Sequence, residues 1–446
     1  MIHCPQSKGW GHFNIESNNM ALNKDQQAVF MKIIKFINGP DQFMDVSGGA
    51  GTGKTHLIKE IADGILKHQT NKTMHTVEIT ATTNKAAAVI SDAMPHRAGQ
   101  IGTIYSLMNL RVSENFNTGA VKIVPTPNWF VHSRTLFIVD ECSMVNTDLF
   151  KYIQKGIDSS CKVLFVGDKN QLAPVKENIS PIYARGMDTG LLQTSVRNAG
   201  QQALMDLCEQ AKQTVLTGVF TRIKEVPGVI DFVDGTTLKG ILEREFLNED
   251  PCKRVLSYTN KRVIEYNTFI RQLRNYTHPY EVGEILSNNS SAELVGKTRL
   301  YTDQVVRVVR VTDDFMDDSI VPGEEVRMIN MNVEDVNSGA TYQVTAFADQ
   351  QDRTLVLKFY SGNKKWDRFF KIKNAYPDLR SVSASTTHKA QGSTYDSVVV
   401  DLADIGRSTN KEQTARLQYV ALSRPRSRLF IRGELPDRYF EHRRQE

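Results

Sequence analysis

The fold is decided by residues 43–55, which read FMDVSGGAGTGKT. The short apolar run from Phe43 to Val46 suits a buried strand of a parallel sheet. The residues Gly48 to Thr55 match the phosphate-loop pattern of glycine, any four residues, glycine, lysine, and serine or threonine. A helical pattern from His56 to Lys67 follows. This order of strand, loop and helix predicts a nucleotide-binding loop, because a flexible glycine-rich turn does not require it.

The chemistry of phosphate binding explains the residue types in this loop. Glycines let backbone N–H groups converge on a β-phosphate, and the positive end of the helix dipole adds to the attraction. We expect Lys54 to reach the β- and γ-phosphates of ATP and the Thr55 hydroxyl to bind Mg²⁺. The expected nucleotide-binding residues are Gly48, Gly49, Ala50, Gly51, Thr52, Gly53, Lys54 and Thr55.

Two further apolar runs end in polar side chains. The run Leu136–Val139 is followed by Asp140 and Glu141, a pattern that also occurs as an ordinary loop start. With a phosphate loop upstream, we expect Asp140 to hold Mg²⁺ and Glu141 to orient and deprotonate the attacking water. The string GDKNQLAPV at 167–175 also follows a run, and its Gln171 is expected to hydrogen-bond the γ-phosphate or that water.

The chain alternates apolar runs with helical patterns, which predicts a doubly wound α/β fold. Its 446 residues suggest about two to four domains. A second α/β pattern begins near Arg254 and resumes at Ser383. Between these positions, short apolar runs separated by turn residues predict strands of a small β-barrel. The expected strands are Val305–Val311, Val326–Ile329, Tyr342–Phe347 and Leu355–Phe359.

We therefore expect an N-terminal extension, two α/β domains and two insertions. The extension is 1–20, and the first domain is 21–199, with a hairpin excursion at 109–133. The second domain is 200–276 with 377–446, and the β-insertion is 277–376.

The composition limits the class of protein without deciding its function. The net charge of +5 and the pI near 8.7 are compatible with a nucleic-acid partner. No stretch approaches the roughly 18 apolar residues of a membrane span. Residues 1–20 lack the apolar core of a secretory signal, so we expect a cytoplasmic protein. Five scattered cysteines predict single buried thiols and argue against a disulfide framework or a structural zinc site.

The order of motifs from Leu22 to about Phe430 resembles that of superfamily 1 helicases. The string TNKAA at 83–87 is ambiguous, since the UvrD-like branch has a similar one. The string at 167–175 and STTHKAQG at 385–392 look like the RecD/Pif branch, and a β-barrel insertion agrees. This resemblance implies two RecA-like domains, an SH3-like β-barrel insertion, and movement 5′ to 3′ along single-stranded DNA.

The resemblance also implies roles around the nucleotide. Gln26, in LNKDQ at 22–26, would read the adenine, although Asn23 and Gln26 also fit a helix-capping box. Arg197 and Arg424 match the positions of two arginine fingers, and Gly392 lies in a nucleotide-site motif. An arginine aimed at the transferred phosphoryl group can raise the rate by about 10³ to 10⁵.

A further set of residues is expected to contact DNA, because hydroxyls and amides suit phosphate contacts that are made and released repeatedly. Tyr105 stands where the family has histidine, which leaves that contact open, and Thr394 replaces a glutamate expected at a ribose. Phe116 is a candidate for stacking on a strand-separating pin, with local core as the alternative. The full set is Thr82, Lys85, Thr103, Tyr105, Phe116, Asn260, Thr386 and His388.

The sequence thus favours an ATP- and Mg²⁺-dependent DNA helicase acting on single-stranded and forked duplex DNA. We expect a monomer without a membrane partner, and a single-stranded-DNA-binding protein is a candidate partner. One alternative is a translocase that displaces proteins or acts on RNA and unwinds poorly. Another is a nucleic-acid-binding protein for which the nucleotide is only a switch, although Glu141, Gln171 and both arginines argue for hydrolysis.

Overall fold

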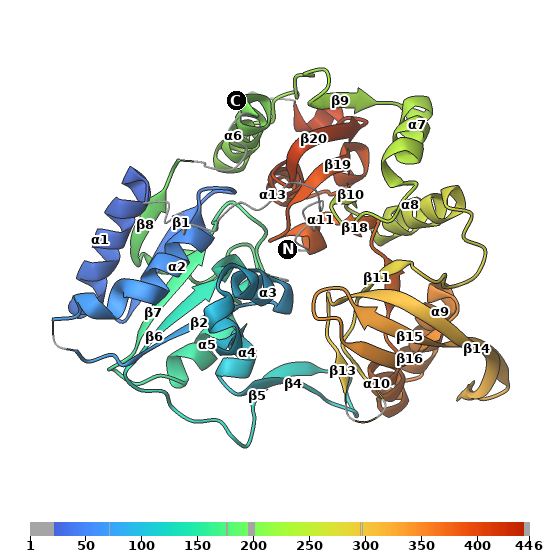
Figure 1. The fold of residues 1–446 in the computed structure, drawn as a ribbon, viewed down its shortest axis with the longest axis horizontal. Helices are drawn as coiled ribbons and strands as arrows, with labels where there is room; N and C mark the ends of the chain where they lie inside the picture. Colours follow the sequence, from blue (N-terminus) through green and yellow to red (C-terminus); the bar gives the residue numbers. More distant parts are fainter. Residues whose placement is uncertain are drawn as a thin grey trace, which may run out of the picture. The chain divides into compact units, whose positions relative to one another are not determined.

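The computed structural model describes residues 22–70, 72–174, 177–194, 201–294, 296 and 298–440. The chain forms two compact units (Figure 1). Unit 1 comprises Met1–Leu110, Pro125–Phe232 and Thr387–Glu446. Unit 2 comprises Arg111–Val124 and Val233–Thr386.

Unit 1 contains a parallel six-stranded sheet in the order β3-β2-β6-β7-β1-β8. Every residue of β6 is buried, because helices cover both faces of such a sheet. The apolar runs Phe43–Val46 and Leu136–Val139 lie in β1 and β6, so these expected strands are confirmed. The bounds are β1 Phe43–Gly48, β2 Thr76–Ala81, β3 Ile101–Thr103, β6 Thr135–Asp140, β7 Lys162–Gly167 and β8 Asp188–Leu192.

The helices of unit 1 begin where the sequence supplies caps. Asn23 caps α1, Thr83 caps α3 and Asn146 caps α5, each accepting a backbone N–H of the first turn. The bounds are α1 Lys24–Asn38, α2 Lys54–Gly64, α3 Asn84–Ala93, α4 Ile104–Leu107, α5 Thr147–Lys155, α6 Gln202–Thr217, α11 Thr387–Ala390, α12 Leu402–Ile405 and α13 Lys411–Leu422.

Parallel strands of the second α/β pattern occur in both units. Unit 1 has the parallel pair β19 (Tyr395–Asp401) and β20 (Pro425–Arg432). Unit 2 has the parallel pair β10 (Lys253–Ser257) and β18 (Ala384–Thr386). The strand β9 spans Ile230–Val233. The protein is therefore an α/β protein with two parallel sheets and a separate antiparallel sheet.

The antiparallel sheet lies in unit 2 and has the strand order β16-β15-β14-β11-β17. Its core includes Val306, Met331 and Val344 on the neighbouring strands β14, β15 and β16. The strand bounds are β11 Ile285–Asn288, β12 Ala292–Glu293, β13 Arg299–Leu300, β14 Val305–Val321, β15 Glu324–Asp335, β16 Thr341–Phe347 and β17 Leu379–Ser381. The helices of this unit are α7 Gly235–Phe246, α8 Asn260–Leu273, α9 Gln350–Gly362 and α10 Trp366–Ala375.

One expected strand is wrong. Residues Leu355–Phe359 lie inside α9, and α10 follows, so the insertion is not built of strands alone. Asp349 accepts the backbone N–H of Gln351 and starts the helix. The apolar positions Val356 and Tyr360 are four residues apart and buried on one face, which is the helical period.

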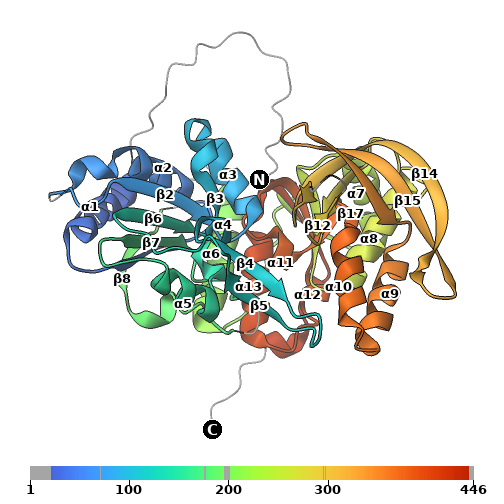
Figure 2. The ribbon, with the colours of Figure 1, turned by 90° about the horizontal axis from the view of Figure 1, so that it is seen from below.

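The excursion at 109–133 contains the expected hairpin, formed by β4 (Leu110–Glu114) and β5 (Val121–Pro125). Figure 2 shows its tip beside α10. Gly119 at the tip has a φ of +72°, and a Cβ there would lie 2.7 Å from ring atoms of Trp366. Lys373 forms an ion pair with Glu114 at 3.0 Å. The hairpin is therefore fixed against α10 within unit 2.

Two properties of the whole chain complete the fold. Cys142 and Cys161 are free thiols, as expected, but Cys252 is disulfide-bonded, so the expectation of single thiols is wrong there. Sequence spacing alone does not reveal which cysteines pair. Across the described residues, none of the helices has the length and apolar character needed to span a bilayer.

Candidate nucleotide-binding site

The loop between β1 and α2 has the backbone of a phosphate loop. Gly51 and Gly53 have φ values of +80° and +79°, in the left-handed region that favours glycine. A Cβ on Gly48 would lie 2.6 Å from Oγ1 of Thr52, so the loop has no room for a larger residue there. Thr52 in turn donates its hydroxyl to the Gly49 carbonyl at 3.0 Å.

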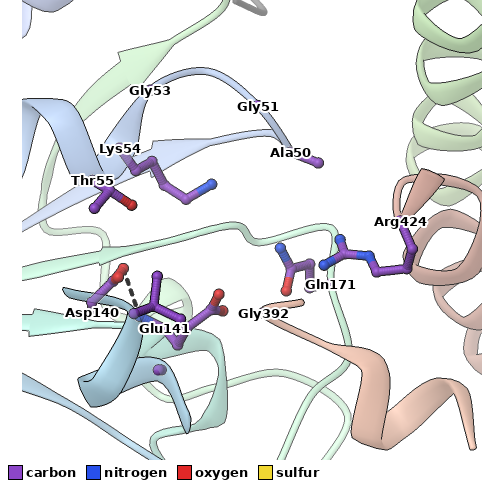
Figure 3. A pocket seen from close by; sticks show the side chains of 12 residues that line it. Ala50, Gly51, Gly53, Lys54, Thr55, Asp140, Glu141, Gln171, Gly392 and Arg424 are labelled. Atoms are coloured by element: carbon purple, nitrogen blue, oxygen red, sulfur yellow. Dashed lines mark hydrogen bonds between the residues drawn. The ribbon is translucent and has the colours of Figure 1, made fainter. Parts of the chain in front are cut away.

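Lys54 begins α2 and its side chain bends back over this loop. Its Nζ donates to the carbonyl oxygens of Gly48 at 2.8 Å and Gly49 at 3.0 Å. The ammonium group therefore lies on the cavity side of the loop, where the phosphates of a bound nucleotide are expected (Figure 3).

Two carboxylates stand at the end of β6. Asp140 accepts the backbone N–H of Glu141 at 2.8 Å through Oδ1. Burial, together with the neighbouring Glu141 carboxylate, raises the pKa of Asp140 to about 7. Glu141 has a φ of +52°, and its buried Oε2 has no hydrogen-bond partner among the described residues. A buried carboxylate pair of this kind fits a cation, because a cation would offset both the burial and the repulsion.

The loop, the carboxylates and two further motifs line one cavity of about 230 Å³ in unit 1 (Figure 3). Most of the residues predicted for the nucleotide site meet there, and two residues that the sequence did not single out, Ala86 and Val89, join them. The predicted residues that line the cavity are Ala50, Gly51, Gly53, Lys54, Thr55, Asp140, Glu141, Gln171, Gly392 and Arg424.

Arg424 lines this cavity, and the residue is buried, with 2% exposure. Its Nε donates to the Val420 carbonyl at 2.8 Å and its NH1 donates to the Ser393 carbonyl at 2.9 Å. In Figure 3 the Arg424 guanidinium and the Gln171 amide point toward each other. The buried Oε1 of Gln171 has no partner among the described residues, so it is open to a group entering the cavity. The other predicted arginine, Arg197, lies outside the described residues.

A tyrosine that the sequence did not single out joins three of these motifs. The Tyr419 hydroxyl donates to Oδ2 of Asp168 at 2.7 Å and accepts the backbone N–H of Ala50 at 3.0 Å. Nearby on the same helix, Arg416 donates to the carbonyl of Gln171 at 2.8 Å. Helix α13 is thus hydrogen-bonded to the phosphate loop and to the 168–171 turn. The available signal was a tyrosine five residues before Arg424.

Gln26 lies behind the loop and does not line the cavity. The capping box of Asn23 and Gln26 is confirmed by reciprocal hydrogen bonds. The Gln26 Nε2 also donates to the carbonyls of Thr52 at 3.3 Å and Gly53 at 3.4 Å. In this structure its side chain therefore supports the phosphate loop.

The residues expected to contact DNA are divided between the two units. Unit 1 holds Thr82, whose hydroxyl donates to the Glu141 carbonyl at 3.3 Å, and Thr103, which caps α4. Unit 2 holds Asn260 at the start of α8 and Phe116 at the hairpin. Lys85, Tyr105 and His388 belong to unit 1, and Thr386 belongs to unit 2.

A phosphate loop, an acidic pair and an inward arginine in one cavity define a P-loop nucleotide-binding domain. Residues 21–219 match the AAA domain family model, and residues 381–431 match the UvrD-like helicase C-terminal domain model. The chain is 25% identical to the ATP-dependent DNA helicase dda of Enterobacteria phage T4, over 92% of this chain and 98% of that protein.

Other similarities cover a smaller share of the chain or have a lower sequence identity. The RecBCD enzyme subunit RecD of Buchnera aphidicola from Schizaphis graminum is 26% identical over 37% of this chain and 28% of its own. The crystal structure of Pif1 helicase from Candida albicans is 17% identical with a TM-score of 0.47, covering 96% of this chain and 97% of that chain. The two family models and the phage helicase thus support an assignment to the RecD/Pif1 family of superfamily 1 helicases.

Proposed function

We propose that this chain is an ATP-dependent DNA helicase that moves 5′ to 3′ along single-stranded DNA and unwinds forked duplex DNA. The observation that carries the proposal is the single cavity that brings Lys54, Glu141, Gln171 and Arg424 together. A protein that used the nucleotide only as a switch would not require this complete hydrolytic set. The 25% identity over almost the whole length to a phage DNA helicase also supports it.

Each side chain in the cavity has a distinct chemical task in this proposal. Lys54 leaves the two loop carbonyls and neutralises the β- and γ-phosphates of ATP. Glu141, with one carboxylate oxygen unpaired, orients the attacking water and accepts its proton. Arg424 stabilises the charge that develops on the transferred phosphoryl group, and Arg197 is proposed to do the same.

The site also fits Mg²⁺. Among the described residues, no group of three or more histidine, cysteine or acidic side chains could hold a metal ion, so other groups must complete the ligand set. Asp140 and Thr55 face the same cavity, and we propose that they hold the ion with the phosphates as its remaining ligands. When bound, Mg²⁺ neutralises charge on the phosphates. This assignment is consistent with the raised pKa of Asp140, because a buried carboxylate without a cation favours its proton.

Tyr419 supplies a route from hydrolysis to movement. Its hydroxyl holds both Ala50 of the phosphate loop and Asp168 of the turn that carries Gln171. A change in the loop when phosphate leaves would therefore be transmitted to α13. We propose that the two DNA-contacting sets, one in each unit, grip the strand alternately in response.

We propose a functional division into two α/β domains, at 21–199 and at 200–276 with 377–446. The antiparallel sheet of unit 2 is the proposed counterpart of the SH3-like insertion. Gln26 is proposed to read the adenine and also to support the phosphate loop through its hydrogen bonds to Thr52 and Gly53.

The test is steady-state ATP hydrolysis with single-stranded DNA, with RNA of the same sequence, and without either. We expect turnover that rises many-fold with DNA, and its loss in Lys54→Ala. DNA stimulation absent in the parent protein would exclude the motor. Equal or greater stimulation by RNA would move the substrate to RNA.

A further inference from the structure

Helix α10 of unit 2 and the turn that precedes it carry basic side chains that the proposed nucleotide and DNA sites do not use. Lys364, Lys365, Arg368 and Lys371 are all exposed. Within the described part of the chain, none of these four forms an ion pair. We call them the basic cluster. From 363 to 375 the only acidic residue is Asp367, so this segment has a strong positive charge.

The basic cluster lies at the start of α10, the helix that holds the β4–β5 hairpin: Arg368 and Lys371 are on α10, and Lys364 and Lys365 directly precede it. The Phe116 ring meets the Phe370 ring edge to face at 5.5 Å, and Gly119 packs closely on Trp366. Glu114 of the hairpin is already engaged by Lys373 and by the amide of Asn374, at 3.0 and 2.7 Å. Its negative charge is therefore offset by a residue outside the cluster.

The aromatic rings of α10 show which part of a nucleic acid the cluster suits. Trp366 and Phe370 contact Phe369 at centroid distances of 5.5 and 5.1 Å, and the hairpin covers the same group. Proteins that hold single strands usually present aromatic faces for the bases to stack on. Here Phe370 is buried and Trp366 and Phe369 are partly buried, whereas the four cations are exposed. The cluster itself therefore suits phosphates better than bases.

The turn between the helices supports the same interpretation. Lys364 has a φ of +56°, a left-handed conformation in which glycine or asparagine is less strained. This conformation ends α9, and the backbone N–H of Lys365 donates to the Tyr360 carbonyl at 2.9 Å. A lysine at this position gives the turn a charge where a neutral residue would fit its backbone better.

We propose that the basic cluster binds the sugar-phosphate backbone of duplex DNA next to the hairpin. This inference rests on the proposed helicase function and adds a grip on the duplex to the grips on the single strand. It gives the hairpin a fixed position against the fork, because α10 contacts the hairpin and carries Arg368 and Lys371 of the cluster.

The test compares the full-length parent with a variant carrying Lys364→Gly, Lys365→Gln, Arg368→Gln and Lys371→Gln. The glycine removes the charge and relieves the backbone, so the turn is preserved. A matched control carries glutamine at Lys35, Lys67, Lys155 and Lys224. These four lysines are also exposed and unpaired among the described residues. Binding to a blunt duplex and to a single strand is measured over a series of salt concentrations without nucleotide.

We expect the cluster variant to lose at least tenfold in duplex affinity at low salt. The slope of log K against log salt should fall by about 0.9 for each lost phosphate contact. Its single-strand-stimulated ATP hydrolysis should match the control. A duplex affinity and slope equal to those of the control would overturn the proposal, as would an equal loss for single and double strands.

The two hypotheses fail differently. If the parent hydrolyses ATP with DNA stimulation but the cluster variant binds duplex normally, only the duplex-binding site is wrong. If the parent shows no DNA-stimulated hydrolysis, the proposed function itself is wrong.

Discussion

Removing the Tyr419 hydroxyl should lower the free energy of unfolding of unit 1 by the contribution of its hydrogen bonds to Asp168 and Ala50. The side chain is 2% exposed, and its hydroxyl donates to the fully buried Asp168 carboxylate while accepting from Ala50. Burial and the Asp168 charge raise the pKa of Tyr419 well above its ordinary value, so the hydroxyl is always a donor here. A hydrogen bond to a charged group contributes about 1.5–3 kcal/mol, and we expect Tyr419→Phe to cost that much.

The assay is urea unfolding, with the free energy taken from the midpoint and slope. Tyr152→Phe is the matched control, because the half-buried Tyr152 hydroxyl has no hydrogen bond to a described residue. We expect the control to change stability by less than about 0.5 kcal/mol. A double-mutant cycle with Asp168→Ala should give a coupling energy of about 1–3 kcal/mol. A change in Tyr419→Phe no larger than in the control would refute the bridging role.

Three further outcomes are expected. Gly119→Ala should separate the hairpin from α10, since the new Cβ would lie 2.7 Å from the Trp366 ring and the left-handed backbone costs a further ~1–2 kcal/mol. Fork unwinding should fall while DNA-stimulated ATP hydrolysis remains. Unchanged unwinding would contradict this expectation. In metal-free protein the raised pKa of Asp140, about 7, means that the folded state retains a proton that the unfolded chain loses near 3.8. Stability should therefore fall as the pH rises from about 4 to 7, and Asp140→Asn should flatten that part of the profile measured by thermal unfolding. Lys54→Ala should abolish ATP turnover, and hydrolysis at the parent rate would show that the site is wrongly assigned.

Site residues were predictable where a short motif directly follows a recognisable strand or precedes a recognisable helix. The order of strand, glycine loop and helix identifies Gly48 to Thr55, and an apolar strand before two acids identifies Asp140 and Glu141. These groups then meet because the carboxyl ends of parallel strands lie along one edge of a sheet.

Other contacts could not be predicted because they join distant positions. The Ala50 and Tyr419 hydrogen bond spans 369 residues, and the packing of Gly119 on Trp366 joins a hairpin to a remote helix. No local pattern encodes either contact.

The wrong strand has a local cause. The run Leu355–Phe359 is short and mostly apolar, and such a run is ambiguous between strand and buried helix. Asp349, six residues earlier, is a helix cap that the sequence did display. Together with the four-residue spacing of Val356 and Tyr360, it would have favoured the helix.

The most direct measurement uses two matched duplexes, one with a 5′ single-stranded tail and one with a 3′ tail, in the presence of ATP and Mg²⁺. A helicase that moves 5′ to 3′ should unwind only the 5′-tailed duplex, and Lys54→Ala should unwind neither. Unwinding from the 3′ tail alone would contradict the proposed direction. Continued ATP hydrolysis with neither duplex opened would contradict the helicase function itself.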